Sequence, residues 1–431
     1  MLQIGAAKVR LPMKIGQTMA GYMRRADGAI GLHDDLFVRA LIATDGQEQV
    51  CLLVLDTLFV NAAFVSSVRQ KISAISQMHP KSIMVTATHT HSAPAGIAQF
   101  TLDSSSESYL GTYNPDFAAD TQSAVVDAAK EAIANLIPVR MYTGTGQANN
   151  VAKNRVDPHG PYDPDIPFLV AIDQDDTVVA TVFSFACHST VMGPQNRQYS
   201  GDLIGMTCLY LEEHWGAKSV TLGLAGAAGD ISTRFTRKEA SFAEVDRLAT
   251  ALSEAILGAY KQPDNDDVID SQHRRLQLRL APVESPTTLR KQLSIAEHHL
   301  ATLDKPNASE TRAIQAEIEG LEIALKAAPH RPTHVKTEVH LLQIGSALLT
   351  GFPGEMFVEY GLTVRQELQP KHVLVAGYAN DYIGYVPTPE STSGYETSVA
   401  VVNPGVGQQL MNAIYSLGNN LTLKNKKYGG I

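Results

Sequence analysis

The sequence predicts a mixed α/β fold, in which β-sheets are flanked by helices and an antiparallel helical hairpin is inserted at about residues 285–329. Short runs rich in Val, Ile and Leu, bounded by turn residues, predict strands. Between them lie longer segments in which apolar residues recur every three or four positions, and these predict helices. This alternation of elements is typical of layered α/β or α+β proteins.

The first part of the chain predicts a β-hairpin followed by a crossover. Residues 36–44 and 49–56 are apolar runs on either side of an Asp-Gly turn, so they predict two antiparallel strands. The segment 62–76 has helical spacing, and the apolar run 82–87 follows it. A strand, helix and strand in this order predict a right-handed crossover between two parallel strands.

The middle of the chain continues the alternation. Pro and Asp directly after Asn114 predict a helix that runs to about residue 135. Ser241 and Glu244 have the spacing of a capping box at the start of another helix. Residues 154–167 form a loop rich in Asp, Pro and Gly, which is long enough to carry function. Strands are expected at 140–145, 168–172, 178–186 and 219–224.

Residues 285–329 predict two antiparallel helices, because two segments with helical spacing lie on either side of the turn at 304–309. A packing or dimerisation arm and a lid above a site are both compatible with this hairpin. A homo-oligomer formed through it is therefore one expectation. Strands resume at 335–344 and 347–350.

Composition excludes several classes of function. The net charge of -9 gives no broad basic surface, so we expect no nucleic-acid partner. No stretch reaches the roughly 18 to 20 apolar residues of a membrane span, and the first residues do not read as a signal peptide. The three cysteines lie in apolar segments and suit buried thiols in a reducing compartment. We therefore expect a cytoplasmic protein without a transmembrane segment.

Two histidines follow one of the apolar runs. Residues 88–92 read Thr-His-Thr-His-Ser, and in an extended segment His89 and His91 would point the same way. Imidazole is the commonest protein ligand for zinc, and a catalytic zinc site needs about three protein ligands and one open position. Ordinary surface or hydrogen-bonded histidines give the same short pattern.

Other chemically capable residues also follow apolar runs. His188 is a further imidazole at a strand end, although a hydrogen-bonded core histidine fits that segment too. Glu355 could bind a metal or cap a helix that begins at Met356. Tyr382 and Tyr385 could bind a Lewis acid or an oxyanion, or could simply pack.

Ser232 follows a glycine-rich turn without the elbow motif of an α/β-hydrolase. Near a metal ion it could act as a nucleophile, because a cation lowers the cost of forming the alkoxide. A turn serine that only binds backbone would look the same in this segment.

Taken together and in order, these segments resemble the neutral/alkaline non-lysosomal ceramidase family, whose members are zinc amidases. The resemblance rests on short motifs, namely THTHSAPAG at 88–96, NR at 154–155, FACHST at 185–190, GDIS at 229–232, PGE at 353–355 and NDYIGY at 380–385. It implies a single catalytic domain over residues 1–431, without the C-terminal β-sandwich domain of the secreted members.

The resemblance also implies roles for individual residues. One zinc ion per chain would be held by His89, His188, Glu355 and Tyr385. Ser232 would be the nucleophile, or would position a water that attacks in its place. His91 and Tyr382 would lie beside the substrate carbonyl, and Arg155 would contact the substrate or its oxyanion.

The activity that the resemblance implies is zinc-dependent hydrolysis of the amide bond of an N-acyl substrate, a small molecule that could be a lipid. Thr233 stands where the family usually has Pro after the serine, so the local turn could differ. A zinc hydrolase of a more polar small N-acyl or ester substrate is the nearest alternative. A non-catalytic metal- or ligand-binding protein is an alternative of another class, although it would have no need of Ser232.

Overall fold

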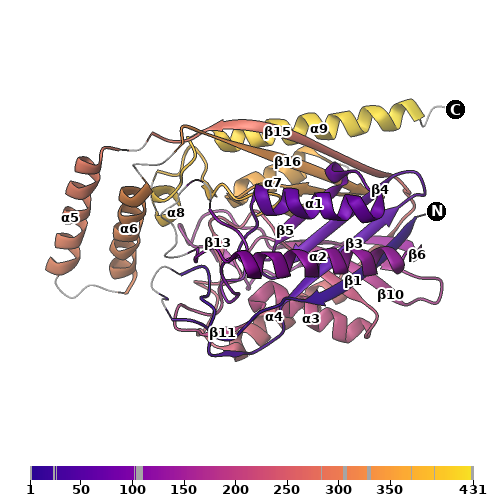
Figure 1. The fold of residues 1–431 in the computed structure, drawn as a ribbon, viewed down its shortest axis with the longest axis horizontal. Helices are drawn as coiled ribbons and strands as arrows, with labels where there is room; N and C mark the ends of the chain where they lie inside the picture. The colour runs from indigo at the N-terminus through magenta and orange to yellow at the C-terminus, as the bar shows by residue number, and fades with distance from the viewer. Residues whose placement is uncertain are drawn as a thin grey trace.

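The computed structural model describes residues 2–22, 25, 27–100, 102, 110–282, 284–303, 308–327, 332–369, 371–392 and 394–428. It confirms the mixed α/β fold (Figure 1). Three larger sheets and three two-stranded pairs make up the β structure of these residues.

The first sheet has the strand order β5-β4-β3-β1-β6. The predicted hairpin is present, since β3 (Phe37–Thr44) and β4 (Gln49–Leu55) pair antiparallel. The predicted crossover also forms, because β5 (Ile83–Ala87) pairs parallel with β4 after helix α1 (Ala62–Ser76) and the short helix η1 (Pro80–Ser82). The remaining strands are β1 (Gln3–Arg10) and β6 (Ile137–Pro138), and helix α2 (Pro115–Ala134) packs on β1 and β3.

The second sheet has the order β12-β10-β9-β7-β14. Its strands are β7 (Arg140–Gln147), β9 (Asp165–Ile172), β10 (Val178–Phe185), β12 (Val220–Ala225) and β14 (Lys261–Asp264). Helices α3 (Asp202–Trp215) and α4 (Phe242–Leu257) cover its outer face. Strand β9 begins at Asp165, so the expected loop at 154–167 is shorter at its end than predicted.

The third sheet has the order β15-β16-β17-β19. It consists of β15 (Ile269–Arg279), β16 (His334–Ile344), β17 (Ala347–Gly351) and β19 (His372–Ala376). Helix α7 (Val358–Glu367) packs against β19, and α9 (Val406–Tyr428) packs against β15 and β16.

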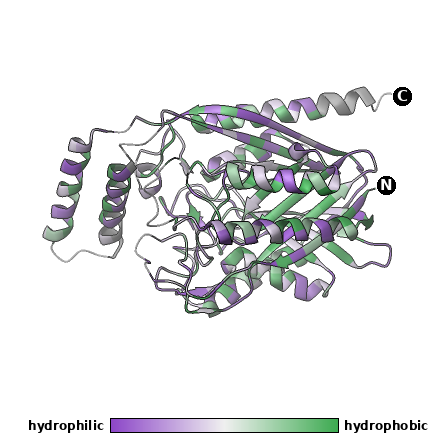
Figure 2. Ribbon diagram, viewed as in Figure 1, coloured by the Kyte–Doolittle hydropathy of each residue, from purple (hydrophilic) through white to green (hydrophobic). Residues whose placement is uncertain are grey.

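The three sheets share one core. Because successive strand residues point to opposite faces, Leu41 of β3 joins the core between the sheets while Ile42 joins the core under the helices. The inner core also contains Leu169 of the second sheet and Leu342 of the third. The first and third sheets therefore face the second, with helices outside, and Figure 2 shows the apolar strands inside this sandwich.

The helical hairpin is confirmed as α5 (Pro286–Thr302) and α6 (Ala308–Ala327), which lie side by side at the end of the molecule opposite the termini (Figure 1). The turn at 304–307 and residues 328–329 lie outside the described residues. Ala296, Ile314 and Ile318 form a small core between the two helices. Helix α6 also contacts the short helix α8 (Tyr395–Ser398).

Three short strand pairs lie in the loops near the hairpin. They are β2 (Gly31–Leu32) with β11 (Gln198–Tyr199), β8 (Lys153–Asn154) with β13 (Ile231–Ser232), and β18 (Glu355–Met356) with β20 (Tyr385–Val386). Strands β5, β10, β17 and β19 all end at this side, so the residues that follow them meet there.

Two predicted helix caps are corrected. Helix α7 begins at Val358 and not at Met356, and Glu355 lies in β18, so it caps no helix. The backbone N–H of Val358 donates instead to Asp230 Oδ1 at 2.8 Å. At α4, Ser241 accepts from Glu244 N as expected, but Glu244 Oε1 accepts from Lys238 N, so the reciprocal half of the capping box is absent.

Cys51, Cys187 and Cys208 are buried free thiols, as expected. Among the helices of the described residues, none combines the length and apolarity required to cross a membrane.

Candidate metal centre

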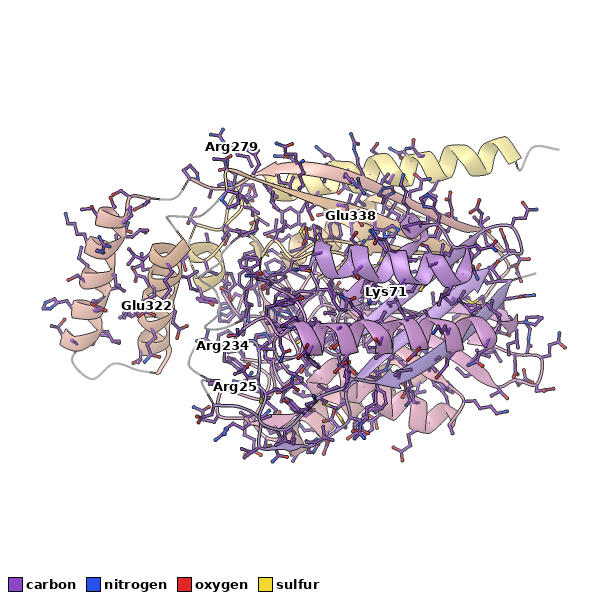
Figure 3. All side chains as sticks on the ribbon, viewed as in Figure 1. Arg25, Lys71, Arg234, Arg279, Glu322 and Glu338 are labelled. Atoms are coloured by element: carbon purple, nitrogen blue, oxygen red, sulfur yellow. The ribbon has the colours of Figure 1, made fainter. Side chains whose placement is uncertain are left out.

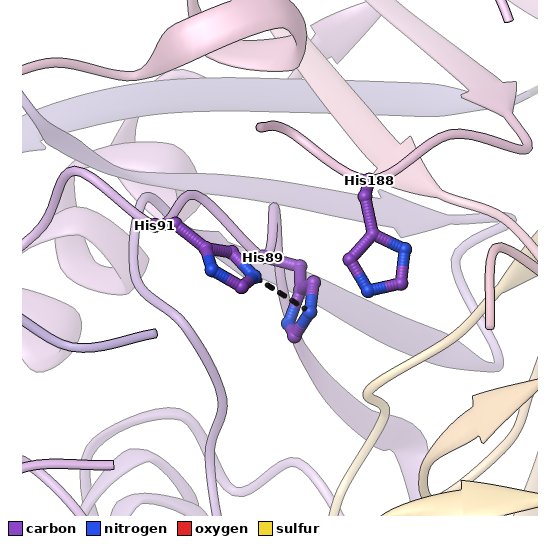
Figure 4. Close-up of side chains that lie close together, drawn as sticks. All are labelled: His89, His91 and His188. Carbon is purple, nitrogen blue, oxygen red and sulfur yellow. Dashed lines mark hydrogen bonds between the residues drawn. The ribbon is translucent and has the colours of Figure 1, made fainter. Parts of the chain in front are cut away.

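Three histidines from two strand ends meet in the loops at the hairpin end of the molecule. His89 and His91 follow β5, and His188 follows β10. One nitrogen from each ring lies within 4.8 Å of the others, and all three residues are buried (Figure 4). Such a group could hold a metal ion.

The backbone at His89 differs from the extended segment that the sequence predicts. His89 has a φ of 57°, which is the left-handed region. A residue other than glycine seldom adopts this conformation, and it is found most often at functional sites. The turn still brings the two rings together, with 3.3 Å between the Nε2 atoms of His89 and His91.

Hydrogen bonds to backbone carbonyls fix the tautomer of two of these rings. His89 Nδ1 lies 2.7 Å from Leu58 O, and His188 Nδ1 lies 2.6 Å from Ala228 O. A carbonyl oxygen only accepts, so each Nδ1 carries the proton and donates. Burial lowers the pKa of His89 to about 3 and that of His188 well below 6.5, so both rings are neutral at pH 7. Each Nε2 therefore presents a lone pair.

Glu355 of β18, the short strand that follows β17 in the chain, completes this cluster. Its Oε2 lies 2.9 Å from His188 Nε2 and 3.5 Å from His89 Nε2. Although these distances are short, Oε2 is buried and makes no hydrogen bond. Its other oxygen, Oε1, accepts a hydrogen bond of 2.5 Å from the Tyr382 hydroxyl.

A cation fits this arrangement. Three electron-pair donors converge without a proton between them, namely Nε2 of His89, Nε2 of His188 and Oε2 of Glu355. Arg155 Nη2 donates to His188 Nε2 and supplies one positive charge beside these donors, and a metal ion at the point where they converge would offset the remaining repulsion. Mixed nitrogen and oxygen donors are those of zinc sites, and carbonyls that hold the far nitrogen of each imidazole are typical of metal-binding histidines.

His91 differs from the other two histidines. Its Nδ1 is buried but has no hydrogen-bond partner. Gly21 packs closely against this ring, since a Cβ at Gly21 would lie 2.4 Å from His91 Nδ1. Because no carbonyl orients His91 from behind, the ring lacks the support that His89 and His188 have. This difference favours a place for His91 on the substrate side of the cluster.

The two tyrosines of the 380–385 segment take different positions. Strand β20 pairs in parallel with β18, and this register places Tyr385 opposite Glu355. The Tyr385 hydroxyl accepts a 3.0 Å hydrogen bond from Arg155 Nη2, whereas Tyr382 donates to Glu355. Burial and then Glu355 raise the pKa of Tyr385 well above 10.

Arg155 lies at the centre of the polar contacts. Its Nη2 also donates to His188 Nε2 at 3.1 Å and to Gly229 O at 2.9 Å. A guanidinium only donates, so the contact with His188 is independent evidence that this Nε2 is unprotonated. Burial lowers the pKa of Arg155, but Tyr385, Glu396 and Glu355 more than offset this, and Arg155 remains charged.

Ser232 lies in β13, which pairs with β8 beside Arg155. Its side chain is buried, and its Oγ accepts from the backbone N–H of Arg234 at 3.2 Å. Asp230, in the same short segment, accepts from Asn154 Nδ2 at 2.6 Å and from Val358 N at 2.8 Å. Asp230 thus fixes the turn that carries Ser232, and burial raises the pKa of this carboxyl to about 7.

A cavity of about 1340 Å³ opens over the cluster. Seven of the eight residues singled out from the sequence line it, namely His89, His91, Arg155, Ser232, Glu355, Tyr382 and Tyr385. The eighth, His188, lies fully buried behind its wall. The structure therefore brings the eight residues together, while their individual roles stay predictions.

Charged side chains line the cavity together with apolar ones such as Leu58, Leu110 and Ile314. Arg234 and Arg237 line one side, and Figure 3 shows Arg234 at the hairpin end of the molecule. Glu317 and Glu319 of α6 line it as well, together with Glu396 of α8. The hairpin thus contributes to the wall of the cavity.

Two residues of the site were missed from the sequence. The ring of Tyr378 stacks on His89 with 3.9 Å between the ring centres, and Glu396 lies 2.7 Å from Arg155. Neither belongs to one of the motifs. Tyr378 lies two residues after the apolar strand β19, as His89 does after β5, so its position at a strand end was a signal in the sequence. Glu396 follows no apolar run, and only the three-dimensional packing reveals it.

Comparison with known proteins gives one family. A family model described as neutral/alkaline non-lysosomal ceramidase, N-terminal, matches residues 12–258. The neutral ceramidase of Pseudomonas aeruginosa is 23% identical over 449 residues, which cover 88% of this chain and 65% of that protein. The neutral ceramidase of Mycobacterium tuberculosis is 23% identical over 456 residues, which cover 86% of this chain and 69% of that protein.

Solved structures show the same fold. The crystal structure of the neutral ceramidase from Pseudomonas aeruginosa superimposes with a TM-score of 0.76 at 21% identity, over 97% of this chain and 75% of that one. A structure described as ceramidase complexed with C2 gives a TM-score of 0.77 at 19% identity, over 98% and 75% of the two chains.

Proposed function

Because the chain belongs to the neutral/alkaline non-lysosomal ceramidase family, we propose that it is a zinc-dependent hydrolase that cleaves the amide bond of an N-acyl substrate. The observation that carries the proposal is the convergence of His89 Nε2, His188 Nε2 and Glu355 Oε2 without a proton between them. The family membership supports the reaction class, and the cluster supports the metal.

The proposed ligands are His89, His188, Glu355 and Tyr385. When bound there, zinc would supply Lewis acidity toward the scissile carbonyl. The carbonyls of Leu58 and Ala228 hold the two imidazoles in the tautomer that a metal requires. Zinc is preferred over other divalent ions because the donors are nitrogen and oxygen with an open side toward the cavity.

The other residues at the cavity would act on the substrate. Arg155 directs charged N–H groups into the site, so it can stabilise negative charge that develops on the carbonyl oxygen. Ser232 lines the same cavity, and its hydroxyl would attack the carbonyl carbon or orient an attacking water. Neutral His91 has an imidazole nitrogen that can accept the proton released by that attack.

The substrate could be ceramide, as the names of the relatives suggest, or a more polar N-acyl compound. The lining of the cavity is mixed. Arg234, Arg237, Glu317 and Glu319 line it together with apolar side chains such as Leu58, Leu110 and Ile314. The lining therefore favours neither a lipid nor a polar N-acyl compound, and the substrate panel below decides between them.

Release of free amine from a panel of N-acyl compounds tests the proposal. The panel contains ceramide, short N-acyl amino sugars, N-acyl amino acids and a matched ester. Purified protein is assayed as isolated, after dialysis against a chelator, and after zinc is restored. Amine release that is lost on chelation and regained with zinc is expected, and the best substrate identifies the class. Absence of hydrolysis from the whole panel in the zinc-loaded protein would favour the non-catalytic alternative.

We also infer that residues 1–431 form one catalytic unit. The inner core, which contains side chains from all three sheets, supports this inference. The site supports it too, because His89, His188 and Glu355 follow strands of three different sheets. Oligomerisation through the hairpin and a cytoplasmic location stay predictions.

A further inference from the structure

A second acidic residue faces the site from the side of the hairpin. Glu396 lies in α8, is 6% exposed and lines the cavity. Its Oε1 is 2.7 Å from Arg155 Nε. The contact is an ion pair and not a hydrogen bond, because the Nε–H makes no hydrogen bond.

The ion pair uses a different nitrogen of the guanidinium from the contacts with the metal cluster. Nη2 of Arg155 donates to Gly229 O, Tyr385 and His188, while Nε faces Glu396. The main chain is fixed separately, since Arg155 N donates to Asp230 O at 2.7 Å. A long side chain has many rotamers, so contacts at two nitrogens of the guanidinium restrict it more than contacts at one.

Helix α8 is in turn held by the hairpin. A Cβ at Gly320 of α6 would lie 3.0 Å from Ser398 Oγ and 3.2 Å from Val399 Cγ1. The absence of a side chain at Gly320 therefore permits the two helices to approach closely. Figure 1 shows α6 next to α8.

We propose that Glu396 is a positioning residue that holds Arg155 at the metal cluster, and that the docking of α6 on α8 keeps Glu396 in place. This inference rests on the proposed function, because it assigns Glu396 a part in the same site. It also gives the hairpin a role other than that of a packing or dimerisation arm.

The charge of Glu396 matters for the metal as well as for the substrate. Arg155 Nη2 donates to the same His188 Nε2 that we assign to zinc. A metal must displace this contact, and an unpaired buried guanidinium would oppose the incoming cation. Glu396 neutralises the guanidinium and gives it a second contact, so metal binding is expected to depend on it.

The test compares the wild type with Glu396→Gln, Glu396→Asp, Arg155→Met and the Glu396→Gln/Arg155→Met double variant. Zinc affinity of the chelator-stripped protein is measured by competition with a zinc indicator. The kcat and KM for the best amide substrate are measured in parallel. Glu244→Gln is the matched control, since it removes a different Glu–Arg ion pair, with Arg247 of α4, away from the cavity.

Glu396→Gln is expected to weaken zinc binding about tenfold and to lower kcat about tenfold or more, with a smaller change in KM. Glu396→Asp keeps the negative charge, so its losses of zinc affinity and of kcat should be smaller than those of Glu396→Gln. In the Arg155→Met background, Glu396→Gln should have no further effect on either quantity, because the residue through which it acts is gone. Glu244→Gln should match the wild type.

Additive losses in the double variant, or unchanged zinc affinity and kcat in Glu396→Gln, would overturn the positioning role. Thermal unfolding of the wild type, Glu396→Gln, Arg155→Met and the double variant gives a readout that needs neither metal nor activity. If the wild type binds no zinc and cleaves no amide, the proposed function fails. In that case the unfolding midpoints still test the ion pair. If the changes in midpoint of the two single variants add up in the double variant, Glu396 and Arg155 are not coupled. If they do not add up, the two residues are coupled although the site has no metal and no amidase activity.

Discussion

His188 Nε2 lies 2.9 Å from Glu355 Oε2, yet no hydrogen bond joins the two atoms. The proton of His188 is on Nδ1, which donates a hydrogen bond to Ala228 O. Arg155 Nη2 donates a hydrogen bond to His188 Nε2. A carboxylate and an imidazole lone pair therefore face each other in a buried site. The guanidinium of Arg155 supplies one positive charge beside this contact, and a metal ion held by both atoms would offset the remaining repulsion.

The first prediction separates His91 from the metal ligands. His91→Ala should keep one zinc per chain, because no carbonyl orients its ring for coordination. Its kcat should fall about 100-fold or more, as expected for loss of a group that accepts a proton. Elemental analysis and steady-state kinetics on the same preparation measure both quantities. Loss of the metal in this variant would instead make His91 one of the ligands.

The second prediction concerns the two tyrosines. Tyr385→Phe should weaken zinc binding, since we assign its hydroxyl to the metal. Tyr382→Phe should retain the metal and lower kcat about tenfold, because it removes only the hydrogen bond to Glu355 Oε1. Zinc titration of the two stripped variants side by side measures the difference. The reverse order of zinc affinities would exchange the two roles.

The third prediction is a pH dependence of stability. Burial raises the pKa of Asp202 from 3.8 to about 6. The folded state therefore binds this proton more tightly than the unfolded state, so the contribution of Asp202 to the free energy of unfolding is largest below about pH 4. It falls by about 3 kcal/mol as the pH rises to 6 and above.

Denaturant unfolding of the wild type and of Asp202→Asn from pH 4 to 7 measures this contribution. The variant is expected to lose stability at every pH, because Asp202 accepts from the N–H groups of Val191 and Met192. The difference between the two proteins isolates Asp202 from other carboxyls that titrate in this range. A difference that does not change with pH would contradict the prediction.

The fourth prediction concerns the hairpin. Gly320→Val should push α6 away from α8, because a Cβ there lies within 3.2 Å of two side-chain atoms. We expect a several-fold lower kcat and weaker zinc binding, since Glu396 and Arg155 lose support. Ile295→Ser, at an exposed position of α5, is the control and should leave kcat unchanged. If Gly320→Val has the same kcat as Ile295→Ser, the docking of the hairpin on α8 plays no part in catalysis.

Much of the fold could be predicted from the sequence. The β3–β4 hairpin, helix α1 and strand β5 have strong periodic patterns because each buries one face in a core. Strand β15 was not predicted, since it is a largely exposed edge strand with many polar residues. Helix α3 was not predicted either, because it is apolar around most of its surface and lacks a clear stripe.

The candidate site was predictable where a residue belongs to a recognisable motif, as His89 and Ser232 do. Glu396 was not, because it reaches Arg155 only through the packing of α8. The backbone at His89 was also beyond sequence reasoning, since a left-handed residue is imposed by its surroundings. The sequence allowed two roles for Glu355, that of a metal ligand and that of a helix cap. The pairing of β18 with β20 excludes the helix cap.

The most direct measurement is the zinc content of the purified wild type, His188→Ala and His372→Ala, together with amine release by each. His372 is a control histidine at the start of β19, where its Nε2 lies 3.1 Å from Phe168 O. We predict one zinc per chain and amide cleavage in the wild type and in His372→Ala, and loss of both in His188→Ala. A wild type that carries no zinc and gains no activity when zinc is supplied would contradict the metal centre and the proposed function.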